Sequence, residues 1–316
     1  MGRLVEGKWE TGWGSPSKGG KFERATAPFR DQISSAKDSP HPPEGGRYHL
    51  YVSYACPWAH RTLLTRALRG LEDTISVTAV SPLMGEGGWE FSAEDPDPVF
   101  GAKYLREVYL NVSPEMTGRV TVPVLFDKKT RTIVNNESRE VMRILDTEFE
   151  AFAKNPVSLA PTELRNRIDE VLTAIYEPIN NGVYRAGFAT KQEAYDKAVL
   201  ELFHALDTWE GVLAKQRFLT GNSLTECDLA LFTTLLRFDL VYYGHFKCNV
   251  RRIADYPNLY GFLRDIYQRP EVKSVCRLDQ IKTHYYWSQD NVNPTRIVPK
   301  GPAVDLDSPH DRARFG

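Results

Sequence analysis

One cysteine lies where sulfur chemistry is easy to arrange. Cys56 follows an apolar stretch, 48–52, that is typical of a strand, and it precedes residues 57–69, which are typical of a helix. Pro57 suits the first helical position, because its missing N–H would have no partner within the helix. The free N–H groups and the positive end of the helix dipole favour a thiolate, so we expect a depressed pKa for Cys56. The alternative is a small buried hydrophobic residue, as free cysteines often are.

Ala59 determines how such a thiol could turn over. It occupies the place where a second cysteine would complete a C-x-x-C motif. A monothiol cannot close its own disulfide, so an external thiol must regenerate it. Glutathione is the abundant intracellular candidate, and the pattern therefore favours a monothiol nucleophile served by glutathione.

The bulk composition excludes several classes of protein. The 316 residues suffice for two domains, and a net charge of −1 argues against a general nucleic-acid binder. No apolar stretch reaches the length of a membrane span, so we expect no membrane partner. The four cysteines show neither a zinc pattern nor a disulfide framework, which predicts no metal and a reducing compartment, by default the cytoplasm.

The first half of the chain predicts an α/β domain. Residues 1–44 are rich in Gly, Pro, Ser and charge, and we expect an irregular extension laid over the body by Trp9 and Trp13. Within 45–150 the pattern gives the order βαβα and then ββα, which is the thioredoxin-like arrangement. The expected strands are 46–52, 74–80, 120–126 and 131–134, and the expected helices are 57–69, 102–110 and one that opens at Glu137 and Ser138.

The second half predicts an all-α domain over 160–287, followed by a polar tail, 288–316. Apolar residues recur there at three- and four-residue steps, as on one face of a helix. Thr190 with Glu193, and Thr225 with Asp228, have the spacing of capping boxes that open helices.

Taken together, these features resemble the cytosolic glutathione transferases. A Val122–Pro123 pair before a hairpin and a Glu-Ser pair at the next helix are part of that likeness. Segment 53–62, with its Cys-Pro-Trp-Ala, is similar to the omega-like group and matches best the glutathionyl-hydroquinone reductases, or Xi class. The Gly-Gly-Trp-x-Phe run at 87–91 points to the same class.

The resemblance implies a glutathione site in the first domain. Glu137 would pair with the ammonium of the γ-glutamyl end, and Ser138 would bond its carboxylate at the helix start; the alternative is ordinary helix capping by Asn135 or Asn136. With Pro123 in a cis peptide, Val122 would pair with the backbone of the tripeptide; the alternative is an edge-strand proline. The resemblance adds Trp89 and Arg119, as cover of the peptide and contact to its glycyl carboxylate.

The resemblance also implies an aromatic substrate site with catalytic tyrosines. Tyr184, Tyr242 and Tyr285 would donate to a phenolic oxygen and stack on the ring, although the sequence leaves Tyr243 and Tyr286 as neighbours that could serve instead. The implied reaction is reduction of a glutathionyl-hydroquinone, in which Cys56 carries glutathione as a mixed disulfide and a second glutathione releases oxidised glutathione. A homodimer is implied as well.

Other functions use part of the same pattern. An omega-like thiol transferase or dehydroascorbate reductase would use Cys56 without a tyrosine-lined site. A non-catalytic carrier of hydrophobic ligands is disfavoured by a Cys-x-x-Ala at a helix start. A chloride-channel-like protein that inserts into membranes is disfavoured by the lack of a long apolar helix.

Overall fold

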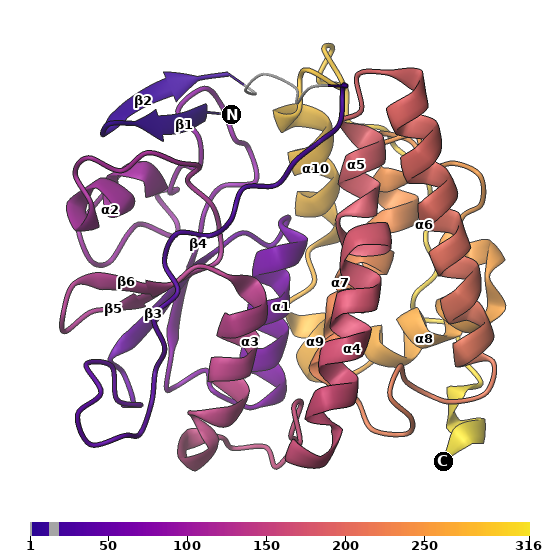
Figure 1. Ribbon diagram of the computed structural model, residues 1–316, viewed down its shortest axis with the longest axis horizontal. Coiled ribbons are helices and arrows are strands. Elements are labelled where there is room, and N and C mark those ends of the chain that lie inside the picture. The colour runs from indigo at the N-terminus through magenta and orange to yellow at the C-terminus, as the bar shows by residue number, and fades with distance from the viewer. Residues whose placement is uncertain (1, 13–18) are drawn as a thin grey trace. The chain divides into compact units, whose positions relative to one another are not determined.

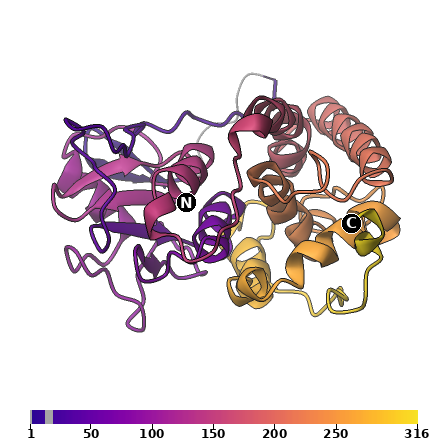
Figure 2. The ribbon, with the colours of Figure 1, turned by 90° about the horizontal axis from the view of Figure 1, so that it is seen from below.

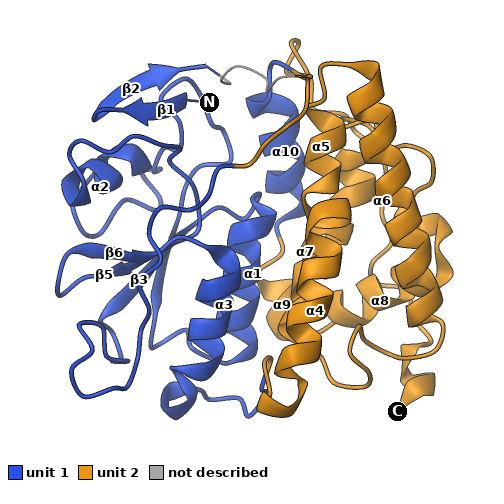
Figure 3. Cartoon of the chain, viewed as in Figure 1, with its two compact units in different colours: residues 1–14, 25–158, 277–291 blue, residues 15–24, 159–276, 292–316 orange. Residues whose placement is uncertain are grey.

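The computed structural model describes residues 2–12 and 19–316 and divides the chain into two compact units (Figure 3). The first unit comprises residues 1–14, 25–158 and 277–291, and the second comprises 15–24, 159–276 and 292–316. The predicted boundaries differ from this division at the C-terminal side. Residues 277–287, expected within the helical domain, and 288–291, expected in the tail, belong to the first unit, so the chain crosses between the units more than once.

The first unit contains the thioredoxin-like arrangement (Figure 1). Its elements are β1 Gly2–Val5, β2 Lys8–Thr11, β3 Tyr48–Val52, α1 Pro57–Leu68, β4 Ser76–Ala79, α2 Leu105–Val112, β5 Val124–Asp127, β6 Thr132–Asn135, α3 Ser138–Thr147, η1 Glu150–Phe152 and α10 Leu278–Ser288. The βαβα and ββα order is confirmed. The expectation of an irregular N-terminal extension is wrong for 2–11, because β1 and β2 form a hairpin; Trp13 lies outside the described residues.

A four-stranded mixed sheet in the order β4-β3-β5-β6 forms the centre of this unit. β3 pairs with β4 in parallel and with β5 antiparallel, and all five residues of β3 are buried. That burial explains why β3 reads as a continuous apolar run. Helices α1 and α3 pack side by side against the sheet (Figures 1 and 2).

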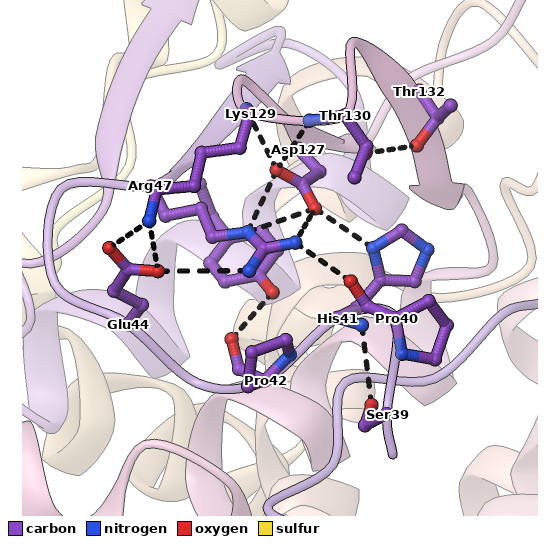
Figure 4. A network of polar contacts seen from close by, with 11 residues as sticks. Ser39, Pro40, His41, Pro42, Glu44, Arg47, Asp127, Lys129, Thr130 and Thr132 are labelled. Carbon is purple, nitrogen blue, oxygen red and sulfur yellow. Dashed lines mark hydrogen bonds and ion pairs between the residues drawn. The ribbon is translucent and has the colours of Figure 1, made fainter.

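A buried ionic cluster fixes the far end of β5 (Figure 4). Asp127 is fully buried, and it accepts hydrogen bonds from Arg47 at 2.9 Å and from His41 at 2.9 Å. Burial acts to raise the pKa of Asp127, but the bonds from Arg47 and His41 outweigh it and hold that pKa well below its usual range. Glu44 extends the cluster to Lys129 in the β5–β6 turn. The segment ahead of β3 is thereby tied to the hairpin that follows it.

The second unit is helical, as predicted. Its elements are η2 Thr162–Leu164, α4 Arg165–Ile175, η3 Tyr176–Asn180, α5 Gly182–Gly187, α6 Gln192–Leu213, α7 Glu226–Arg237, η4 Phe238–Tyr242, η5 Ile253–Asp255, α8 Pro257–Tyr267, α9 Pro270–Ser274 and η6 Arg312–Phe315. Two of the expected long helices end in π-helical turns, η3 after α4 and η4 after α7.

One of the two predicted capping boxes is present. At α7 the Thr225 side chain caps the helix, and Asp228 accepts from the Thr225 N–H at 2.8 Å. The box at Thr190 is wrong, because α6 begins at Gln192 with Lys191 as its N-cap and no side-chain capping bond. Thr190 instead donates its N–H to the carbonyl of Gly20, which holds it one residue outside the cap.

Candidate active site

Cys56 occupies the position that its sequence context predicts. It is the N-cap of α1, with an extended backbone (φ −77°, ψ 120°), and Pro57 is the first helical residue. The Cys56 carbonyl accepts the first intrahelical bond from the N–H of His60 at 2.9 Å. The side chain is half-buried, so the sulfur lies at a helix N-terminus without being sealed from a reactant. Such a position favours the thiolate electrostatically.

The loop that carries Val122 lies directly beside this sulfur. The Val122–Pro123 peptide bond is cis, and Val122 is buried. The strand expected over 120–126 is shorter than predicted, because β5 begins only after this proline. Cys56 Sγ lies 3.7 Å from the Val122 carbonyl oxygen. Tyr109 of α2 donates to the Thr121 carbonyl at 2.8 Å and so helps to fix the loop. The structure therefore brings two of the predicted site residues together.

The other cysteines have different surroundings. Cys227 also lies in the first turn of a helix, α7, but it is fully buried. Its burial, and to a lesser extent the negative charge of Asp228, raises the pKa of its thiol well above the ordinary value. Burial likewise raises the pKa of Cys248. Cys276 is half-buried, with Sγ 3.2 Å from the Val272 carbonyl oxygen. A helix start alone does not make a reactive thiol, and Cys56 differs by its accessibility.

Glu137 and Ser138 begin α3. Glu137, not Asn135 or Asn136, is the N-cap, and its carboxylate accepts from the Arg139 N–H at 3.2 Å. Asn135 accepts from the Glu137 N–H at 2.8 Å and so orients that residue. Ser138 is buried, and its hydroxyl has a long contact of 3.5 Å to Glu137 Oε1. Because Glu137 already caps the helix, the Ser138 hydroxyl is not needed for capping.

Trp89 lies in the glycine-rich loop and packs on α10. Its ring stacks on His284 with centroids 4.9 Å apart and planes 15° apart. Tyr285, the next residue of α10, is buried and lies edge-on to His284 at 5.5 Å. The sequence interpretation placed Tyr285 in the helical domain, whereas the structure assigns it to the first unit. His284 was not singled out from the sequence, since no local pattern links it to Trp89.

Arg119 is exposed and follows Gly118 in the segment that leads to Val122. Its contact to a glycyl carboxylate stays a prediction. The same holds for the ligand contacts predicted for Trp89, Val122, Glu137 and Ser138, which stay predictions.

Tyr184 and Tyr242 belong to the second unit, where they form one aromatic cluster. Their ring centroids lie 5.9 Å apart, and Tyr242 stacks on Phe246 at 5.4 Å. Both tyrosines are buried, whereas the alternatives Tyr243 and Tyr286 are half-buried. The structure thus brings two predicted substrate tyrosines together within one unit.

Within residues 2–12 and 19–316, no group of three or more His, Cys, Asp or Glu side chains could hold a metal ion. None of the helices in that part of the chain is both long and apolar enough to cross a membrane.

Family models match both halves of the chain. Residues 55–148 match the N-terminal domain of glutathione S-transferase, and residues 192–265 match its C-terminal domain. The matched regions fall in the two units that hold Cys56 and Tyr242, respectively.

Individual relatives cover nearly the whole chain. Glutathionyl-hydroquinone reductase YqjG of Escherichia coli is 50% identical, with 100% of each chain covered, and its glutathione-bound structure superposes with a TM-score of 0.90 over 99% of this chain and 100% of that one. Glutathionyl-hydroquinone reductase PcpF of Sphingobium chlorophenolicum is 48% identical over 97% of this chain and 98% of its own. A Xi class glutathione transferase from Natrialba magadii is 52% identical, with a TM-score of 0.94 over 100% of this chain and 97% of that one.

Proposed function

The chain belongs to the glutathione S-transferase family, within it to the Xi class, and we propose that it reduces glutathionyl-hydroquinones with Cys56 as the nucleophile. The observation that carries this proposal is the half-buried sulfur at the start of α1, 3.7 Å from the Val122 carbonyl of the cis-proline loop. Two relatives, 50% and 48% identical to this chain, are named glutathionyl-hydroquinone reductases.

The reaction has two steps: cleavage of a thioether by the Cys56 thiolate, and then a thiol–disulfide exchange. In the first, the Cys56 thiolate attacks the sulfur of the glutathionyl group; an S–S bond forms, the bond between sulfur and ring carbon breaks, and that carbon takes up a proton. The hydroquinone leaves, and Cys56 carries glutathione as a mixed disulfide. In the second, the thiolate of another glutathione attacks this disulfide, and oxidised glutathione leaves with Cys56 restored as a thiolate. The ring carbon is reduced, and the two glutathione sulfurs are oxidised.

Each predicted site residue has a role in these steps. Glu137 and Ser138 hold the γ-glutamyl end of glutathione at the start of α3, where backbone N–H groups favour its carboxylate. Val122 pairs with the peptide backbone, and Trp89 and Arg119 hold its glycyl end. The hydroxyls of Tyr184, Tyr242 and Tyr285 are expected to donate to the phenolic oxygens and to assist proton transfer to the ring.

One assay separates this function from the nearest alternative. Turnover of a glutathionyl-hydroquinone and of dehydroascorbate is measured on the same enzyme preparation with glutathione as reductant. We expect the hydroquinone substrate to dominate. Preference for dehydroascorbate would indicate an omega-like reductase, and turnover of neither substrate would favour a ligand carrier.

We also propose a homodimer located in the cytoplasm. The family resemblance supports the dimer, and four free cysteines agree with a reducing compartment. Size-exclusion chromatography coupled to light scattering measures the molar mass and so tests for the dimer. The mass of a single chain at assay concentration would contradict it.

A further inference from the structure

The N-terminal hairpin contacts two loops that carry predicted glutathione-binding residues. β1 and β2 pair antiparallel, with Leu4 opposite Trp9, and the turn between them places Glu6 and Gly7 at positive φ. The hairpin is a separate two-stranded sheet and adds no strand to the central one. Its contacts to the rest of the first unit therefore show what it does.

The first strand of the hairpin pairs with the segment ahead of the cis-proline loop. Leu4 is fully buried; its N–H donates to the Gly118 carbonyl at 2.8 Å, and the Gly118 N–H donates to the Leu4 carbonyl at 2.9 Å. The N–H of Gly7 bonds the Met116 carbonyl at 3.1 Å, and a Cβ on Gly7 would collide with the backbone of Pro114. The residue after Gly118 is Arg119, so this pairing sets where the segment to Val122 starts.

The second strand of the hairpin fixes the loop that ends in Trp89. The Trp9 indole N–H donates to the Glu86 carbonyl at 2.8 Å, and a Cβ on Gly88 would lie only 2.9 Å from the Trp9 ring. Gly88 also has a φ of 82°, which favours glycine there. The indole therefore packs directly on the backbone next to Trp89.

Arg106 of α2 completes this arrangement. Its guanidinium lies over the Trp9 ring at 5.1 Å and over the Tyr104 ring at 3.9 Å, and it donates to the Gly87 carbonyl. The Leu105 N–H bonds the Trp89 carbonyl at 2.9 Å. Every residue of the run 86–89 is thus held by a contact from Trp9 or from the start of α2.

We propose that the N-terminal hairpin is a positioning element of the glutathione site, with Trp9 as the positioning residue for Trp89. Trp9 acts through the loop backbone and touches no reacting atom. The inference rests on the proposed function, because it takes Trp89 as a glutathione contact. It predicts that the hairpin tunes glutathione affinity and leaves the chemistry at Cys56 alone.

The test compares single variants of the full chain. Trp9→Ala removes both the indole N–H bond and the ring beside Gly88. We expect the Kd of glutathione by calorimetry and the KM for glutathione to rise about ten-fold, with kcat at saturating glutathione within two-fold of wild type. Trp9→Phe keeps a ring but loses the N–H donor, so its affinity is expected to lie between the two.

The hairpin offers a matched control in Arg3→Ala. Arg3 makes an exposed ion pair with Glu10 across the hairpin, and that variant should keep wild-type affinity. Wild-type affinity in folded Trp9→Ala would overturn the inference. A lower kcat, a higher KM and a lower melting temperature together, not restored in Trp9→Phe, would also overturn it, because that pattern indicates a merely structural role.

Two further outcomes are also decisive. If Trp9→Ala does not fold, Trp9→Phe is decisive in the same assays, and unchanged glutathione affinity in it overturns the inference. If wild type itself binds no glutathione, the proposed function fails and this inference fails with it. If wild type binds glutathione but the Trp9 variants bind it equally well, only this inference is overturned, and the proposed function is unaffected.

Discussion

The Ser138 hydroxyl offers the sharpest test of the glutathione site, because helix capping does not depend on it. Glu137 is the N-cap of α3 and accepts from the Arg139 N–H at 3.2 Å, whereas Ser138 Oγ has only a 3.5 Å contact to the same carboxylate. Ser138→Ala therefore leaves the cap in place. We expect little change in melting temperature, in contrast to the loss of about 1 kcal/mol that removal of an N-cap usually brings.

The effect on glutathione binding should be much larger. Ser138 is 3% exposed, so a bond from its hydroxyl to a carboxylate is shielded from water. Loss of one such charge-assisted bond costs about 1.5–3 kcal/mol, which corresponds to a roughly ten- to hundred-fold weaker Kd by calorimetry. Thr147→Ala removes a hydroxyl at the opposite end of α3, where it donates to the Arg143 carbonyl, and is the matched control.

Glu137→Gln separates charge from capping. The amide oxygen can still accept from the Arg139 N–H, but the charge opposite the ligand's ammonium is lost. We expect weaker glutathione binding with a nearly unchanged melting temperature. Unchanged affinity in both Ser138→Ala and Glu137→Gln would refute the assignment and reduce the pair to helix capping.

Three further predictions concern catalysis and stability. Cys56→Ser should abolish hydroquinone-forming turnover, while serine at each of the other three cysteines keeps it; near-wild-type turnover by Cys56→Ser would contradict the mechanism. Phenylalanine at a predicted substrate tyrosine should slow that turnover by roughly ten- to ten-thousand-fold, yet barely affect reduction of the mixed disulfide of glutathione and 2-mercaptoethanol; equal losses would indicate structural damage. The tyrosines are Tyr184, Tyr242 and Tyr285. Burial raises the pKa of Asp228 from 3.8 to about 6, so the folded state holds this proton more tightly than the unfolded chain. Its contribution to the free energy of unfolding should fall by about 3 kcal/mol as pH rises from below the unfolded pKa through the folded one. In urea titrations we expect the free energy of unfolding of wild type, minus that of Asp228→Asn, to fall as pH rises through this window. A rise in that difference would contradict the reasoning.

Local patterns were enough to predict much of the first unit and the thiol within it. The helix start at Cys56 and Pro57 and the proline inside a strand run are features of neighbouring residues. The structure confirms the first, with Cys56 as N-cap. The second is only partly right, because β5 begins at Val124 and Pro123 therefore lies just ahead of the strand, after a cis bond. The Thr225 capping box is equally local, and it is present.

Contacts between residues far apart in the chain could not be predicted in this way. Nothing near Trp89 indicates that His284 stacks on it, because that pairing depends on the return of α10 to the first unit. The N-terminal hairpin was not predicted, because Gly7 and its polar neighbours have the composition of a loop. Its register becomes meaningful only once Leu4 has Gly118 to pair with.

The return of α10 has a consequence for synthesis and for cutting the protein apart. A chain ending at residue 158 contains every strand of the central sheet but lacks α10, and with it the His284 ring that covers Trp89. The first unit therefore cannot be finished until residue 291 has left the ribosome, after all of α4 to α9 has been made. Domains usually fold one after another in chain order during synthesis, but here the two units are interleaved, and the last residue of the first unit, 291, precedes the last residue of the second, 316, by only a short tail. A fragment cut between the matched family regions should accordingly yield a first half with an uncovered aromatic surface, and supplying residues 277–291 on a separate peptide should cover it.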